Sequence, residues 1–138
     1  MIANTRIRVP HGGIAYLAEL RQSRRGYRIL TYDTRDKEIK QAFSYGRKAE
    51  GIKPVLLITL ESYEQVVCTQ EQVFFTAEGE PIQAKDLKPG MNLLSACMSI
   101  SAAVLSVEER RETEVYSLPV FEGENFVLCS GGLVTRTE

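Results

Sequence analysis

The sequence has almost no net charge, no long apolar run and no secretion signal, and each of these absences argues against a class of protein. The net charge over 138 residues is −1, so no overall electrostatic field attracts nucleic acid or an anionic membrane. No apolar run approaches the ~18–20 residues of a membrane span, and residues 1–6 lack the apolar core of a signal peptide. We therefore expect a cytoplasmic protein without a membrane or nucleic acid as partner. Two basic pairs are interpreted as solvated charges: Arg24-Arg25 and Arg110-Arg111.

The cysteines and the histidine form no recognisable metal or disulfide pattern. The chain has three cysteines, an odd number, and no two of them are spaced as C-x-x-C, which argues against a disulfide framework and a zinc site. The one histidine, His11, precedes Gly12-Gly13 and is expected in an exposed turn. Cys68 and Cys129 occur in apolar stretches, where cysteine packs as a small buried side chain. No metal or other cofactor is expected.

Short strands dominate the pattern. Alternating and β-branched runs predict strands over residues 5–9, 28–32, 55–60, 65–68, 73–76, 101–107, 114–120, 126–129 and 133–135. Glycine-rich turns separate many of them. Two short helices are predicted, one from Ile14 to about Gln22 and one from Ala84 to Leu87, the second ended by Pro89-Gly90.

Length and spacing indicate one all-β domain. A chain of 138 residues is the size of one domain, and 43% hydrophobic with 25% charged residues is typical of a globular protein. Short strands at intervals of about 8–12 residues favour a sandwich or barrel over a βαβ sheet. Segments 12–32 and 79–95 each contain a glycine turn, a short helix and an apolar strand. A duplicated β-fold is the simplest interpretation.

Several motifs, in order along essentially the whole chain, resemble those of Hint domains. Residues 51–76 are similar to the block in which a strand leads to T-x-x-H, and residues 79–90 to the G-x-x-x-x-A-x-x-L-x-x-G-D segment that follows. The other similar segments are 4–7 and 29–33 (first block), 114–120 (V-Y-D-L-x-V), 125–128 (N-F) and 132–134 (the start of the closing block).

The Hint superfamily includes inteins, bacterial intein-like domains and Hedgehog autoprocessing domains. The resemblance implies an all-β fold, a pseudo-twofold horseshoe of mostly antiparallel strands with two short helices. It also implies a single minimal domain over residues 1–138, because no endonuclease fits between Ser95 and Thr113.

The resemblance further implies an intramolecular acyl shift. In the family, a Cys or Ser at the first position attacks the preceding carbonyl. The histidine of T-x-x-H protonates the departing nitrogen, and its threonine helps to hold the strained peptide. An aspartate in V-Y-D tunes later proton transfers. The last asparagine then cyclises, helped by the histidine before it, and cuts the C-terminal junction.

Most of these chemical positions differ in this chain. Thr69 keeps the threonine, but Gln72 replaces the histidine and cannot deliver a proton near neutral pH. The nucleophile, the aspartate and the closing His-Asn pair are replaced by Met1, Ser117, Thr135 and Arg136. A methionine cannot attack a carbonyl, and without the asparagine no succinimide can form. We therefore expect that the chain does not splice.

Two functions remain open. The first is a non-catalytic Hint module of phage or mobile-element origin that acts as a scaffold by binding a protein, a flanking polypeptide or a small ligand. The starting Met1 fits a free-standing gene product better than an intein embedded in a host protein. The second is an atypical self-processing element that cleaves one junction, with Ser117 as nucleophile. The first is favoured because no histidine is available as a base for Ser117. Structural hydrogen bonding is likewise favoured for Thr69 and Gln72.

Overall fold

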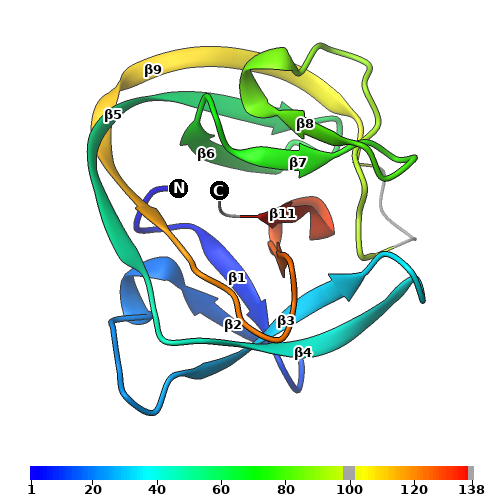
Figure 1. The fold of residues 1–138 in the computed structure, drawn as a ribbon. Helices are drawn as coiled ribbons and strands as arrows, with labels where there is room; N and C mark the ends of the chain where they lie inside the picture. The colour runs from blue at the N-terminus through cyan, green and yellow to red at the C-terminus, as the bar shows by residue number, and fades with distance from the viewer. Residues whose placement is uncertain (98–101, 137–138) are drawn as a thin grey trace.

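The computed structural model describes residues 1–97 and 102–136, and it is built almost entirely from antiparallel strands (Figure 1). The strands are β1 (Arg6–Val9), β2 (Gly13–Tyr16), β3 (Tyr27–Asp33), β4 (Glu38–Ser44), β5 (Lys48–Leu60), β6 (Gln65–Thr69), β7 (Val73–Phe75), β8 (Pro81–Gln83), β9 (Val104–Ser117), β10 (Phe126–Val127) and β11 (Val134–Arg136). Three 3-10 turns interrupt them: η1 (Leu17–Glu19), η2 (Ala84–Asp86) and η3 (Ser130–Gly132). In this part of the chain, no helix is long and apolar enough to cross a membrane.

The strands form four small sheets around one core. Their orders are β1-β2, β3-β4, β6-β5-β9 and β10-β11-β7-β8. The long strands β5 and β9 run together as a bent ribbon along one side of the molecule (Figure 1). The all-β prediction is confirmed. The described strands do not close into a barrel, because they are hydrogen-bonded into four separate sheets.

The glycine turn and short helix of the predicted internal repeat correspond to a repeated local structure, whereas the apolar strand predicted at the end of the second copy forms only isolated bridges at Asn92, Leu93 and Ser95. The hairpin β1–β2 leads directly into η1, and the hairpin β7–β8 leads directly into η2. Each turn buries one apolar side chain, Leu17 in η1 and Ala84 in η2. In both copies a short helical turn therefore fastens the end of a hairpin to the core.

The core joins side chains from both halves of the chain. Its larger cluster includes Ile7, Leu17, Ile29, Ile58, Leu60, Phe74, Phe126 and Leu133, and a second, small cluster consists of Val73, Phe75 and Val134. Full burial of such a side chain contributes about 1.5–3 kcal/mol. Because these residues are distant in sequence, the two ends and the middle of the chain are held against one another.

The predicted helix from Ile14 to Gln22 is wrong in its first part. Residues Gly13–Tyr16 are strand β2, which pairs with β1 in register from Arg6 opposite Tyr16 to Val9 opposite Gly13. Only the three residues of η1 are helical. The helical spacing of apolar residues was misleading because Ile14 is 56% exposed and faces solvent instead of the core. The second predicted helix is confirmed as η2.

Several strands differ from the predicted ranges, and β8, for example, was not predicted. Strand β4 was not predicted, because its seven residues are charged or polar at most positions and only Ala42 and Ser44 are buried. Strand β5 begins at Lys48, seven residues before the predicted start at Val55. Strand β9 joins two predicted strands into one, and Ser101, the predicted start of the first, lies outside the described residues.

A buried asparagine connects β3 to the chain segment before β10. Asn125 is 3% exposed. Its Oδ1 accepts hydrogen bonds from the Thr31 hydroxyl and the Tyr32 amide, both at 2.8 Å, and its Nδ2 donates to the Tyr32 carbonyl at 3.0 Å. The side-chain amide thus satisfies both backbone polar groups of Tyr32, in the way that a neighbouring strand would.

Replacing Asn125 with alanine is expected to destabilise the protein by about 3 kcal/mol. The variant leaves the amide and carbonyl of Tyr32 without partners, and each unsatisfied buried group costs about 1–3 kcal/mol. Urea denaturation measures the change. Asn92→Ala is the matched control, since Asn92 is exposed and surface changes usually stay within about 0.5 kcal/mol. Equal stability losses in the two variants would contradict this role for Asn125.

The two cysteines expected in the core differ in burial. Cys68 on β6 is fully buried, as predicted. Cys129 is only partly buried, so that prediction is wrong, because Cys129 lies beyond the end of β10 where the chain enters η3. Burial raises the pKa of the Cys68 thiol from 9.0 to about 12.

This pKa shift predicts a pH dependence of stability above pH 9. The folded state keeps the Cys68 proton up to about pH 12, whereas the unfolded state loses it near pH 9. The stabilisation is therefore fully present below pH 9 and is lost as the pH rises toward 12. The free energy of unfolding, measured against pH, should fall more steeply for the wild type than for Cys68→Ala. Parallel curves would refute the assignment.

Candidate functional site

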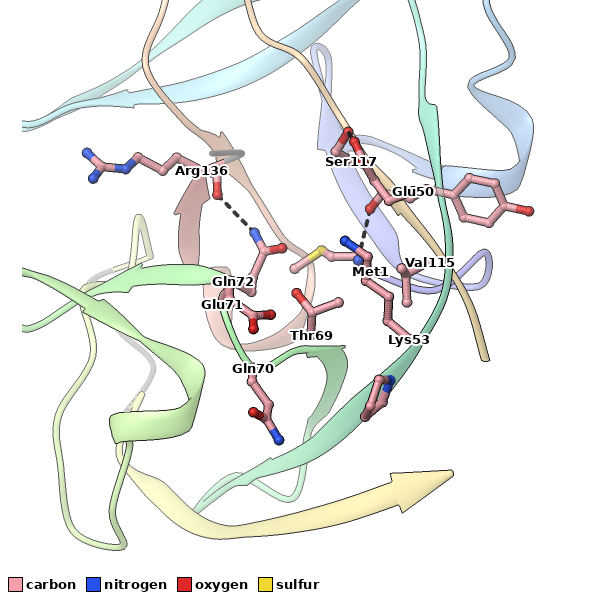
Figure 2. A pocket seen from close by; sticks show the side chains of 12 residues that line it. Met1, Glu50, Lys53, Thr69, Gln70, Glu71, Gln72, Val115, Ser117 and Arg136 are labelled. Atoms are coloured by element: carbon pink, nitrogen blue, oxygen red, sulfur yellow. Dashed lines mark hydrogen bonds between the residues drawn. The ribbon is translucent and has the colours of Figure 1, made fainter. Parts of the chain in front are cut away.

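Five of the six residues singled out from the sequence border one pocket. The pocket has a volume of about 400 Å³ and lies where β6, the β5–β9 ribbon, the N-terminal residue and the end of β11 meet (Figure 2). Its lining includes Met1, Thr69, Gln72, Ser117 and Arg136. The sixth residue, Thr135, is fully buried beside it. The fold therefore assembles positions from the beginning, middle and end of the sequence.

Met1 is inserted into the fold beside β9. Its ammonium group donates to the Tyr116 carbonyl at 2.9 Å, and its own carbonyl accepts from the Tyr116 amide at 2.7 Å. The residue is 3% exposed. Burial lowers the pKa of the amino group below its ordinary value of 8.0, against the opposing effects of Cys68 and Glu50. The first residue thus extends the pairing of β9 into the pocket.

The amide of Gln72 is committed to the C-terminal strand. Its Nε2 donates to Thr135 Oγ1 at 2.7 Å. It also donates to the Arg136 carbonyl at 3.0 Å, and this bond is drawn in Figure 2. The Thr135 hydroxyl in turn donates to the Val73 carbonyl at 2.7 Å. These bonds fasten β11 to β7. The arrangement agrees with the structural interpretation of Gln72, whose side chain holds a backbone carbonyl and has no proton to transfer.

Thr69 differs from Gln72 in having an unused polar group. It ends β6, and its backbone carbonyl accepts from the Gln72 amide at 3.3 Å. Among the described residues its hydroxyl has no hydrogen-bond partner, although it lines the pocket. A polar group of a polypeptide or ligand in the pocket could therefore bond to Thr69 without displacing an existing contact.

Ser117 has a partner that the sequence analysis missed. Its hydroxyl donates to Glu50 Oε1 at 2.7 Å. Both residues line the pocket, and Lys53 lies on the same strand as Glu50. A carboxylate can accept a proton from a hydroxyl, so Ser117 faces a weak base even though no histidine is near it.

A bulge in β5 places Glu50 in this position. The pairing of β5 with β9 shifts register between Ala49 and Ile52, so the two residues Glu50 and Gly51 lie opposite the single residue Val115 on β9. Gly51 has φ of +86°, a conformation that favours glycine. A glycine within a strand pattern is the one signal in the sequence that could have indicated a bulge here.

The remaining candidates lie away from this pocket. His11 is exposed at the β1–β2 turn, as predicted, and does not line the pocket. No group of three or more His, Cys, Asp or Glu side chains in residues 1–97 and 102–136 is arranged to hold a metal ion. The polar groups that line the pocket include hydroxyl, amide, carboxylate and ammonium groups. Among them, Ser117 and Glu50 form a hydrogen-bonded serine–carboxylate pair.

Solved structures of inteins have the same fold over nearly their whole length. The DnaB intein from Synechocystis sp. PCC 6803 superimposes with a TM-score of 0.85 at 17% identity, covering 99% of this chain and 96% of the intein. The bacterial intein-like domain from Clostridium thermocellum gives a TM-score of 0.85 at 14% identity, covering 99% and 96%. The gp41-1 intein gives 0.76 at 20% identity, covering 98% and 95%.

Comparisons of the sequence with family models and with curated proteins found no significant match. The agreement therefore lies in the three-dimensional course of the chain, with identities of 14–20%. The chain has the Hint fold, the all-β fold of inteins and bacterial intein-like domains.

Proposed function

We propose that this chain is a Hint-fold module that does not splice and that acts by binding a polypeptide in its central pocket. The observation that carries the proposal is the arrangement at Gln72. Its amide bonds to Thr135 and to the Arg136 carbonyl, where a self-processing site would need a group able to protonate a departing nitrogen. At the position where the Hint motif has its histidine, this chain has a glutamine that makes structural hydrogen bonds.

The open part of the pocket supports a binding role. Its volume of about 400 Å³ is within the usual range for ligand sites. Thr69, whose hydroxyl has no hydrogen-bond partner among the described residues, lines the pocket. Met1 and Arg136, the two ends of the described chain, also line it. A flanking or partner polypeptide is the occupant that these positions favour. A phage or mobile-element origin stays part of the proposal, and the neighbouring genes would test it.

A fusion of the chain between two folded reporter domains, joined by short flanking peptides, tests the absence of splicing. We expect one uncleaved band on a denaturing gel after several days, with or without added thiol. Methionine has no hydroxyl or thiol with which to form an ester or thioester, and Gln72 cannot act as a general acid. Ligated reporters or released fragments in the wild-type fusion would overturn the proposal.

A second function is favoured by one specific contact, the hydrogen bond from Ser117 to Glu50. It would allow Ser117 to attack one junction, with Glu50 as the base. Cleavage of the fusion that is lost in both Ser117→Ala and Glu50→Gln would establish this function. Ser106→Ala is the matched control, because Ser106 is a serine on the same strand that does not line the pocket.

The proposal also predicts that activity can be restored by two substitutions. Met1→Cys supplies a nucleophile, and Gln72→His supplies a proton donor at the position of the T-x-x-H histidine. In the same fusion, the double variant should release the N-terminal reporter with thiol about 100-fold faster than Met1→Cys alone, within the usual contribution of a general acid.

The control for this restoration is Met1→Cys with Gln70→His. Gln70 also lines the pocket but is not the residue bonded to Arg136. Equal release rates for histidine at 70 and at 72 would show that position 72 has no special geometry. That result would remove the basis for identifying Gln72 as the replaced proton donor.

A further inference from the structure

A cluster of three aromatic side chains lies on the surface outside the central pocket. Phe43 and Tyr45 are packed edge to face, with ring centroids 4.8 Å apart, and Tyr45 contacts Phe121 at 5.7 Å. Tyr45 and Phe121 are each 50% exposed. None of the three lines the central pocket. Single exposed aromatic residues are common, whereas a cluster of touching rings is a feature that calls for an explanation.

The backbone holds these rings in place. Phe43 and Phe121 exchange two backbone hydrogen bonds, of 2.9 and 2.7 Å. The segment after β9 therefore lies against β4, as Figure 1 shows. Gly26 lies close against the Phe43 ring, where a Cβ atom would collide with it. The exposed faces of Tyr45 and Phe121 thus form a rigid platform, which lowers the entropic cost of binding a ligand.

An arginine-rich loop lies beside this platform. Residues 21–28 contain four arginines and no carboxylate. The loop is fixed next to Tyr45 by a hydrogen bond of 2.9 Å from the Ser23 amide to the Tyr45 carbonyl. A shallow hollow of about 400 Å³ is lined by Gln22, Ser23, Arg24 and Tyr45.

The charges of this loop are mostly available to a ligand. Arg28 pairs with Glu122 at 3.0 Å and is neutralised. Arg24 and Arg25 are exposed, and among the described residues neither forms an ion pair. Arg21 likewise has no side-chain partner in the described part of the chain. The patch therefore presents three positive charges next to flat aromatic faces, although the whole chain has a net charge of −1.

We propose that this surface, defined by Tyr45, Phe121, Arg21, Arg24 and Arg25, binds single-stranded nucleic acid. A base stacks on the exposed ring of Tyr45, and the adjoining phosphates bind Arg24 and Arg25. Single strands offer unstacked bases together with phosphates at short intervals, and proteins bind them with this combination of aromatic and basic side chains. A duplex hides its base faces and is not expected to bind as well. The surface is separate from the central pocket, so this inference stands independently of the proposed function.

Fluorescence anisotropy with labelled oligonucleotides of about ten nucleotides tests the proposal. The probes are oligo-dT, oligo-U and an abasic strand of the same length. We expect dissociation constants on the order of 10 µM at low salt. The abasic strand should bind about tenfold more weakly, which is within the range that stacking of one base contributes. Oligo-dT and oligo-U show whether the surface prefers DNA or RNA. Binding of either strand with the expected affinity supports the proposal.

Salt dependence provides a second measurement. For single strands, each neutralised phosphate contributes about −0.7 to the slope of log K, the association constant, against log salt concentration. Three arginines that each neutralise one phosphate should therefore give a slope of about −2. The absence of binding up to about 1 mM oligonucleotide would overturn the proposal. Equal affinity for a heparin fragment or for the abasic strand would overturn it too, because both results would indicate general attraction of polyanions.

Charge-matched variants separate this patch from the charge of the whole molecule. Arg24→Gln with Arg25→Gln should weaken oligo-dT binding at least tenfold. Arg110→Gln with Arg111→Gln, on the exposed part of β9, removes the same charge and should change it less than twofold. Tyr45→Ala should weaken binding about tenfold, whereas Tyr63→Ala, at the β5–β6 turn, should not. Equal effects in the paired variants would refute the proposed site. Circular dichroism and thermal unfolding check that each variant is folded.

Discussion

The pairing of β5 with β9 is the contact on which the rest of this structure depends. The two strands are the longest in the chain, and their ribbon bends from the core at Ile58 and Leu60 to the pocket at Glu50 and Ser117. Met1 adds to the same ribbon through its two bonds with Tyr116. Because β9 holds the first residue and β5 carries β6 on its other side, the pocket forms only when this ribbon does.

The fold itself constrains the identity of few individual residues. Apolar burial and backbone pairing determine the course of the chain, and many sequences satisfy both. The polar side chains around the pocket are few in number. Among them, Gln72 bonds to Thr135 in a hydrogen-bonded link between β7 and β11. This limited constraint on residue identity explains how identities of 14–20% to inteins accompany TM-scores of 0.76–0.85.

Two surfaces with different chemistry result from this architecture. The central pocket is formed by strand ends and the N-terminal residue, and its polar groups are largely paired with one another. The aromatic platform lies where β4 meets the segment after β9, and the arginines beside it lack ion-pair partners among the described residues. Paired groups stabilise the fold, whereas unpaired charges next to exposed rings remain available for a ligand.

The sequence by itself determined the all-β class, because alternation and turn residues are local properties, and the resemblance of its motifs to those of Hint domains singled out Thr69, Gln72 and Ser117. It did not reveal β4, whose exposed outer face hides the alternation, nor the strand at Gly13–Tyr16, whose apolar residues have helical spacing. Only the tertiary structure decided that Glu50 bonds to Ser117 and that the loop 21–28 lies beside Tyr45. Both contacts join residues from different strands or loops, and they depend on a bulge and on strand register that local patterns do not encode.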